Sequence, residues 1–215
     1  GEGQSIAQRN VFANYVKRSY ELPQEVNDKD DLWSNSRIIC EAIDQTTQGG
    51  GGPVHLNIPF REPLYDKVNY EKTPLPKIIE TSAFEKILPP KELTELVNIW
   101  NASDKKMILC GLLPLEDGSL SENLKKISAD SSVIVLTETT SNLVDKNFIH
   151  NFDGVLTTLS AETIKDFKPD ILLTIGGSFI SKKVKLWLRK YSPKQHWHIE
   201  EIDFHLDTFQ ALTKT

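Results

Sequence analysis

Apolar residues recur at two different spacings between residue 90 and the end of the chain. Short apolar runs predict buried strands at 106–111, 132–136 and 171–175, and a last strand around Trp197 and Ile199. Between these runs, helical spacing gives three apolar stripes: Leu93, Leu96, Val97 and Trp100; Leu120, Leu124 and Ile127; and Ile180, Val184, Trp187 and Tyr191. Short strands that alternate with helices predict a parallel sheet covered on both faces, which is a Rossmann-like α/β domain.

Local signals refine where these elements begin. Pro90 can occupy the first turn of a helix, because a proline there loses no hydrogen bond. Ser119 and Glu122 form a capping-box signature, which predicts Ser119 as the cap of the next helix. Residues 137–159 follow no clear period, and we expect a loop there with a short strand around 154–156.

A helix and a strand are also predicted on either side of the four glycines at 49–52. Residues 31–48 carry apolar side chains at helical spacing, and the glycines can end that helix because they tolerate positive φ. A strand at 54–58 follows, with Pro53 and Pro59 as its limits because proline cannot donate to a sheet ladder.

Prolines are concentrated in the segment after this strand: Pro63, Pro74, Pro76, Pro89 and Pro90. They stand among charged residues with little periodicity, which is typical of an interdomain linker. We therefore divide the chain into a first part at 1–65, a linker at 66–89 and the α/β domain at 90–215.

Composition and charge exclude several classes of function. A hydrophobic content of 39% is ample for a packed core, yet every apolar run is far shorter than the roughly 20 residues that span a bilayer. The net charge of −5 offers little attraction for nucleic acid. Cys40 and Cys110 both lie in apolar patterns, as is usual in a reducing cytosol, so we expect a cytoplasmic protein without a membrane span.

Two features near the predicted strands could bind a ligand. Gly176, Gly177 and Ser178 join a strand to a helix, where backbone N–H groups can bind an anion, but a tight turn is the simpler interpretation because no third glycine completes a dinucleotide fingerprint. His196 and His198 should point to the same side of a strand, but without a third ligand we expect no metal site.

The chain contains no G-x-S-x-G, H-E-x-x-H or G-x-x-x-x-G-K-[ST] motif and no paired-cysteine zinc pattern. Nothing singles out a pair of carboxylates as acid and base, so we assign no catalytic residue. The chain begins GEGQSIAQRN, without an initiator Met or the pattern of a signal peptide. We interpret this start as a cut inside a longer protein. From the residues alone, an anion-binding regulatory module and a pure scaffold both remain open for the α/β domain.

The run GGPVHLNIPFREPLY resembles the end of the pyrimidine-binding domain of thiamine-diphosphate enzymes, where a G-P-V-x-[LI]-x-x-P strand leads into a central domain. Within that superfamily it is most similar to the 2-succinyl-5-enolpyruvyl-6-hydroxy-3-cyclohexene-1-carboxylate synthase family of menaquinone biosynthesis. The start of the chain also resembles this family's N-Q-x-I-x-Q segment, with Gly3 in place of the asparagine.

The resemblance implies that 1–65 is the C-terminal part of a pyrimidine-binding domain and that the α/β domain is the central one. The parent would be a transferase that uses thiamine diphosphate and Mg²⁺ to decarboxylate 2-oxoglutarate and join the product to isochorismate. The family's activating glutamate would lie before residue 1, and its Gly-Asp-Gly triplet is absent. We therefore expect this chain alone to bind neither cofactor and to be inactive.

The resemblance also implies where substrate binds. Gln4 falls on the family's substrate-contacting glutamine, and Lys105 or Lys106 falls near a basic pair that can reach toward the active site. A relative of acetolactate synthase is the alternative within the same superfamily. Because a partial first domain should expose apolar residues, we also expect residues 1–59 to pack against another copy or the central domain, and we expect a homo-oligomer.

Overall fold

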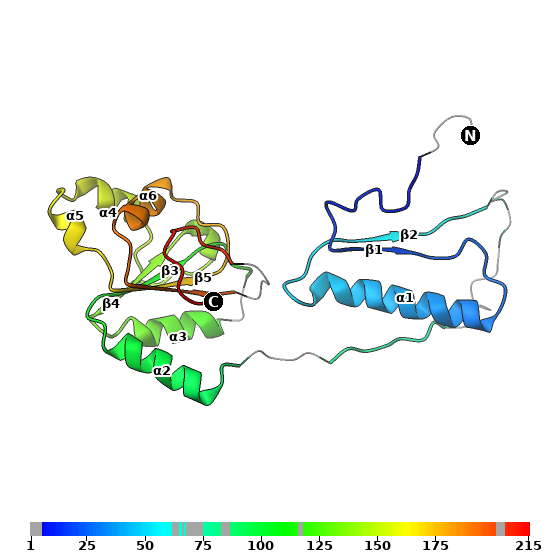
Figure 1. Ribbon diagram of the computed structural model, residues 1–215, viewed down its shortest axis with the longest axis horizontal. Coiled ribbons are helices and arrows are strands. Elements are labelled where there is room, and N and C mark those ends of the chain that lie inside the picture. Colours follow the sequence, from blue (N-terminus) through cyan, green and yellow to red (C-terminus); the bar gives the residue numbers. More distant parts are fainter. Residues whose placement is uncertain are drawn as a thin grey trace. The chain divides into compact units, whose positions relative to one another are not determined.

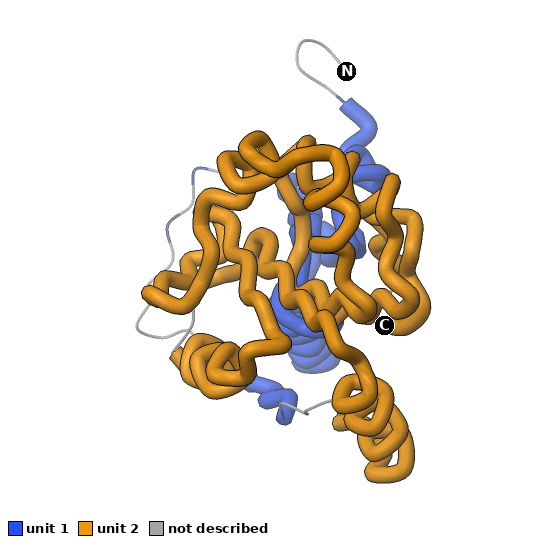
Figure 2. Tube along the Cα trace, turned by 90° about the vertical axis from the view of Figure 1, so that its left-hand side faces the viewer, with its two compact units in different colours: residues 1–86 blue, residues 87–215 orange. Residues whose placement is uncertain are grey.

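The computed structural model describes residues 6–61, 65, 67, 75–82, 87–115, 118–200 and 205–215. The chain divides into two compact units, Gly1–Lys86 and Ile87–Thr215, which Figure 2 distinguishes by colour. The domain limits predicted at residues 65 and 90 stay predictions.

The first unit is a β-α-β arrangement (Figure 1). Strand β1 (Arg18–Glu21) pairs in parallel with β2 (Val54–Asn57), and helix α1 (Lys29–Thr47) connects them. The helix begins two residues before the predicted start because the Asp28 side chain accepts hydrogen bonds from the first free N–H groups. The predicted helix and strand are therefore confirmed.

Much of the apolar surface of the first unit is exposed. Leu32 is 49% exposed and Ile43 62% exposed, although Ala42 of the same helix is buried. Part of the predicted linker lies along this helix, where the Thr81 hydroxyl donates to the Asp44 carboxylate over 2.5 Å. Parallel sheets are usually covered on both faces, so we still expect this unit to pack against another copy or against the central domain. That packing stays a prediction.

The second unit is a three-layer α/β/α arrangement (Figure 1). Its four strands are β3 (Lys106–Cys110), β4 (Val133–Thr137), β5 (Ile171–Ile175) and β6 (Gln195–Ile199). All pairs are parallel, in the order β4-β3-β5-β6. Its helices are α2 (Pro90–Asn101), α3 (Ser119–Ile127), α4 (Phe152–Thr158), α5 (Thr163–Asp166), α6 (Lys182–Lys190) and a 3₁₀ turn at Thr139–Ser141. The Rossmann-like prediction is confirmed.

Side chains of successive strand residues point to opposite faces of the sheet, which creates two cores. Met107 and Leu109 belong to the core that includes Trp187 and the other buried residues of α4 and α6. Ile108 and Cys110 belong to the core on the other face, with Leu124 of α3 and, at its margin, Trp100 of α2. Burial on both sides explains why the sequences of β3, β4 and β5 are mostly apolar.

Three local predictions were wrong. Residues 154–156 lie in helix α4 and not in a strand, because the Asn151 side chain caps the helix by accepting from the Gly154 N–H. Helix α3 has Gly118 and not Ser119 at its cap position. Ile180 precedes α6 and is 64% exposed, so it is not part of the buried helix face.

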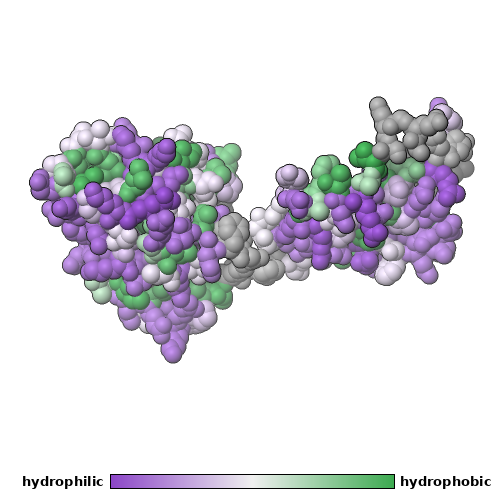
Figure 3. All heavy atoms as spheres, turned by 45° about the horizontal axis from the view of Figure 1, so that its top comes forward, coloured by the Kyte–Doolittle hydropathy of each residue, from purple (hydrophilic) through white to green (hydrophobic). Residues whose placement is uncertain are grey.

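The C-terminal residues cover the outer strand of the sheet. The His198 N–H donates to the Lys214 carbonyl at 3.0 Å. Phe209 of the same segment is fully buried, with its ring beside those of Phe179 and His196. The face of the molecule in Figure 3 shows small groups of apolar side chains among polar ones. No helix in the described part of the chain is both long and apolar enough to cross a membrane.

Candidate functional site at the carboxyl edge of the sheet

The two loops that leave the middle of the sheet meet where β3 and β5 end. From β3 the chain moves outward to β4 and then returns across β3 to β5, so these strand ends form the topological switch point where open α/β sheets bind ligands. Here the Leu112 N–H donates to the Gly177 carbonyl at 2.6 Å, and the Gly177 N–H donates back at 3.0 Å. Two backbone hydrogen bonds therefore join the loops after β3 and β5 and close the crevice between these two strand ends.

Glycine is required for this close approach. A Cβ atom at Gly111 would lie 2.4 Å from the Gly177 carbonyl oxygen, and one at Gly176 would lie 2.5 Å from that of Leu112. Gly176 also has a φ of +77°, which side chains rarely adopt. These glycines therefore allow the two loops to approach each other closely.

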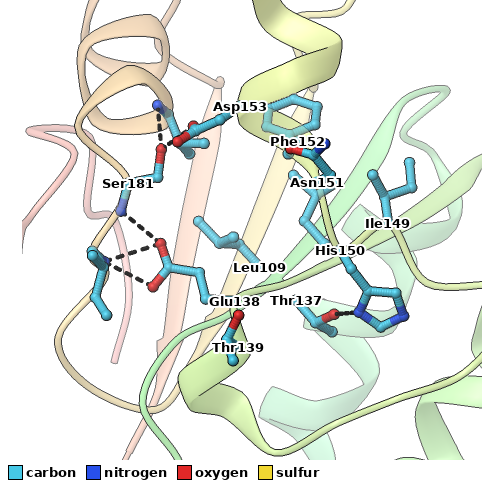
Figure 4. Close-up of a pocket in the computed structure, with 13 residues that line it drawn as sticks. Leu109, Thr137, Glu138, Thr139, Ile149, His150, Asn151, Phe152, Asp153 and Ser181 are labelled. Atoms are coloured by element: carbon cyan, nitrogen blue, oxygen red, sulfur yellow. Dashed lines mark hydrogen bonds between the residues drawn. The ribbon is translucent and has the colours of Figure 1, made fainter.

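A cavity of about 220 Å³ lies beside the closed crevice, between the end of β4 and the starts of α4 and α6 (Figure 4). Its polar lining includes Thr137, Glu138, His150, Asn151, Asp153 and Ser181. The floor is apolar, with Leu109 of β3 and Val184 of α6. Three separate segments at the carboxyl edge thus contribute to one pocket.

Glu138 is the residue that connects these segments. It directly follows β4, and both of its carboxylate oxygens accept from the Ile180 N–H, at 2.9 and 2.7 Å. The first oxygen also accepts from the Ser181 N–H at 2.8 Å (Figure 4). The carboxylate therefore binds the loop just before α6 through charge-assisted hydrogen bonds.

Hydroxyl groups and a second carboxylate complete the pocket. The Ser181 hydroxyl donates to Asp153 and accepts from the Val184 N–H, so it caps α6. The Thr137 hydroxyl is 2.7 Å from Nδ1 of His150, whose side chain is exposed. Both carboxylates of the pocket, Glu138 and Asp153, therefore accept hydrogen bonds from the residues at the start of α6.

A family model described as the middle domain of thiamine pyrophosphate matches residues 85–215. The chain belongs to this family. The thiamine pyrophosphate middle domain is therefore the α/β unit whose carboxyl edge holds the pocket.

The whole chain is also similar to several curated synthases. It is 41% identical to the 2-succinyl-5-enolpyruvyl-6-hydroxy-3-cyclohexene-1-carboxylate synthase of Flavobacterium psychrophilum and 38% identical to that of Flavobacterium johnsoniae. Both alignments cover 100% of this chain but 37% of the relative. The synthase of Desulfotalea psychrophila is 31% identical, over 99% of this chain and 39% of the relative. The chain thus spans well under half the length of these relatives.

Across the described ranges, no group of three or more His, Cys, Asp or Glu side chains could hold a metal ion. The Ile180 and Ser181 N–H groups in the loop before α6 donate to Glu138. We assign no described residue of the middle domain to the diphosphate of the cofactor.

The lysines predicted to bind substrate lie at the opposite edge of the sheet, at the start of β3. Lys106 is buried, and its ammonium donates to the Ser132 hydroxyl at 2.7 Å and lies 3.8 Å from Asp130. The Lys105 ammonium donates to the Asp166 carbonyl. A cavity of about 270 Å³ lies beside both. Their role in substrate binding stays a prediction.

Gln4, another predicted site residue, lies outside the described residues. Gly176, Gly177 and Ser178 form the turn after β5. Gly176 and Gly177 donate their N–H groups to the carbonyls of Ile199 and Leu112, at 3.3 and 3.0 Å. Ser178 has a φ of +40° in the same turn. Anion binding by this turn therefore stays a prediction.

His196 and His198 point to the same side of β6, as predicted, and both are buried. The Thr174 hydroxyl lies between them, 2.9 Å from Nε2 of His196 and 2.8 Å from Nδ1 of His198. Nε2 of His198 is 3.0 Å from the Glu200 carboxylate. A hydrogen-bonded chain from His196 through Thr174 and His198 to Glu200 therefore accounts for the burial of the two histidines.

Thr174→Val should lower the free energy of unfolding by about 2 kcal/mol, because it leaves buried ring nitrogens without their partner. Urea denaturation monitored by tryptophan fluorescence measures the change. The control is Thr94→Val on an exposed face of α2, which removes only a local hydroxyl contact to Pro90. Equal losses in the two variants would contradict a stabilising role for the chain of hydrogen bonds.

Sequence reasoning did not identify the pocket residues. Glu138 carried one usable signal, because a polar residue directly after a buried parallel strand lies at the ligand-binding edge. Asp153, His150 and Ser181 gave no such signal. The sequence predicts a loop with a short strand around Asp153, so helix α4 could not be recognised.

Proposed function

We propose that this chain is part of a transferase that decarboxylates 2-oxoglutarate and joins the product to isochorismate, with thiamine diphosphate and Mg²⁺ as cofactors. The observation that carries the proposal is the similarity over both units. Identity of 38% and 41% extends across all of the chain, so it includes the first unit as well as the middle domain. A shared middle domain alone would match over 85–215 only.

In this proposal the middle domain supports the reaction without performing it. The cofactor supplies the carbanion chemistry, and other parts of the protein hold it. The middle domain contributes a rigid sheet with two buried cores and a closed switch point. Lys105, Lys106 and Gln4 remain the proposed contacts for the acidic substrates, since ammonium groups and amides bind carboxylates. The cytoplasmic location and the homo-oligomer belong to the same proposal.

The test is an assay of the longer protein that contains this chain. We expect product only when 2-oxoglutarate, isochorismate, thiamine diphosphate and Mg²⁺ are all present, as measured by mass spectrometry. The chain 1–215 alone, under the same conditions, should give no product. Turnover of pyruvate to acetolactate, without turnover of 2-oxoglutarate, would contradict the proposal and favour the acetolactate synthase alternative.

A further inference from the structure

Glu200 fixes the direction of the buried side-chain hydrogen bonds between β5 and β6. Its carboxylate can only accept, so Nε2 of His198, 3.0 Å away, carries a hydrogen. A neutral imidazole has one N–H group, and Nδ1 of neutral His198 is therefore an acceptor. The Thr174 hydroxyl lies 2.8 Å from this nitrogen and donates its single hydrogen to it.

The same hydroxyl fixes the tautomer of His196. Because its hydrogen is used on His198, the Thr174 oxygen accepts from Nε2 of His196 at 2.9 Å. Nε2 then carries the only hydrogen of this neutral ring, which leaves Nδ1 bare. In the described part of the chain, Nδ1 is the buried atom of His196 without a hydrogen-bond partner, and the ring lies beside Phe209.

Thr174 has a second acceptor within reach. Its hydroxyl oxygen lies 3.3 Å from the Trp197 carbonyl oxygen. When the hydroxyl hydrogen points to that carbonyl, the two lone pairs of the hydroxyl oxygen can accept from both rings at once. Nδ1 of His198 then carries a hydrogen as well, so this ring is an imidazolium beside the Glu200 carboxylate. The two hydrogen-bonded states differ by one proton and one rotation of a hydroxyl group.

His198 has a counter-ion in contact with it. The Glu200 carboxylate is 3.0 Å away, and a charge-assisted hydrogen bond is stronger than a neutral one. Burial lowers the pKa of His196 to about 4, Asp207 acts in the opposite direction, and His198 lowers it further. His196 therefore stays neutral in the state in which His198 is charged.

The other charged side chains around these rings have partners of their own. Lys214 pairs with β6 through its backbone, and its ammonium contacts Glu92 of α2. Arg189 of α6 donates to the Thr208 carbonyl at 3.0 and 2.8 Å. Strand β5 contributes no charged side chain. Among the described residues, Glu200 is therefore the charged group that decides whether His198 holds a second hydrogen.

We propose that Thr174, His198 and Glu200 form a pH-sensitive switch, in which Nδ1 of His198 takes up a proton from solvent and the Thr174 hydroxyl turns to the Trp197 carbonyl. The charge of the His198–Glu200 pair then changes from minus one to zero, and no ring has to move. The pair lies beside the closed crevice, since a Cβ added at Gly177 would lie 3.2 Å from a Glu200 carboxylate oxygen. Thr174 has no exposed surface, so these groups do not act as a hydrolytic triad. The inference does not depend on the proposed reaction.

Nitrogen NMR of the unchanged chain 1–215 measures where the ring hydrogens lie. Long-range spectra that correlate ring protons with 15N distinguish bare from protonated nitrogens, and carbon labelling connects each ring to its backbone. At alkaline pH, His196 and His198 should both carry their hydrogen on Nε2. On acidification, Nδ1 of His198 should gain a hydrogen, whereas His196 should keep a bare Nδ1 until the pH approaches 4.

Glu200→Gln removes the counter-ion but keeps an oxygen that can accept from Nε2 of His198. In this variant His198 should gain its proton at a pH lower by about 1. The matched control is Glu95→Gln, which neutralises an exposed carboxylate of α2 and should leave the titration of His198 unchanged. Equal effects of the two variants would contradict the proposal, because overall charge and not contact with Glu200 would then govern the proton.

Thr174→Ser and Thr174→Val separate the hydroxyl from the packing around it. The serine variant keeps the donor and the acceptor, so both rings should keep the tautomers of the unchanged chain. The valine variant connects neither ring, so His196 should show both tautomers at alkaline pH. If the valine variant does not fold, the spectra of the unchanged chain and of the serine variant decide.

Any of three results in the unchanged chain would overturn the proposal. The first is a hydrogen on Nδ1 of His196 at alkaline pH. The second is a His198 ring whose Nδ1 stays bare at every pH at which the chain is folded. The third is a tautomer of His196 that changes together with the protonation of His198, because the Thr174 hydroxyl would then not have turned to the Trp197 carbonyl.

Discussion

An alanine at Gly176 should lower the free energy of unfolding of the unit 87–215 by about 3–5 kcal/mol. The residue has a φ of +77°, where a side chain is strained, and the added Cβ would lie 2.5 Å from the Leu112 carbonyl oxygen. It would also lie 2.6 Å from the Leu113 side chain. Because that oxygen accepts from Gly177, relief of the overlap separates the two loops at the switch point.

The measurement is urea denaturation in a Trp33→Phe background. The remaining tryptophans, Trp100, Trp187 and Trp197, all lie in the second unit, so fluorescence then reports its unfolding alone. Gly118→Ala is the matched control, because Gly118 has a φ of +98° but no atom within 4 Å of the added Cβ. The control should lose about 1–2 kcal/mol from backbone strain only. Equal losses at the two glycines would show that the loops are not tightly joined.

The strands β3 and β5 could be predicted because burial on both faces makes them mostly apolar. Met107, Ile108 and Cys110 are fully buried in β3, and so are Ile171 and Leu172 in β5. Helix α4 could not be predicted for the opposite reason. It has seven residues, which include Gly154 and two threonines of low helix propensity, and a side-chain cap from Asn151 sets its start.

The pocket could not be predicted because its contacts join distant parts of the chain. Glu138 and Ile180 are 42 residues apart, and no local pattern of either segment indicates their pairing. The pairing depends on the strand order, which brings the end of β4 and the loop after β5 to one edge. The glycine pair at 176–177 was recognised as a turn, but only the structure shows that its donors face backbone carbonyls.

Acidification should selectively destabilise the second unit through His196. Burial lowers the pKa of this imidazole to about 4 from the ordinary 6.5, against an opposing effect of Asp207 and with a smaller contribution from His198. The ring has no exposed surface, and its Nδ1 has no hydrogen-bond partner. The folded state therefore keeps the neutral ring, with Nε2 bonded to Thr174.

The sign follows from which state binds the proton. The unfolded chain protonates His196 near pH 6.5, whereas the folded chain does so only near pH 4, so the unfolded state binds more protons between these values. Stability from this residue is complete above pH 6.5 and falls as the pH drops to 4, by about 3 kcal/mol in total. Urea denaturation of the Trp33→Phe chain at a series of pH values measures the loss.

His196→Gln separates this effect from the titration of carboxylates, which also begins below pH 5. The variant should be less stable at pH 7, because the buried ring packs against Phe209 at 5.6 Å between ring centroids. Between pH 6.5 and 4, however, its stability should fall by about 3 kcal/mol less than that of the parent chain. Parallel pH profiles for the two chains would show that His196 is protonated, or solvated, in the folded state, and that its burial does not control the acid sensitivity of this sheet.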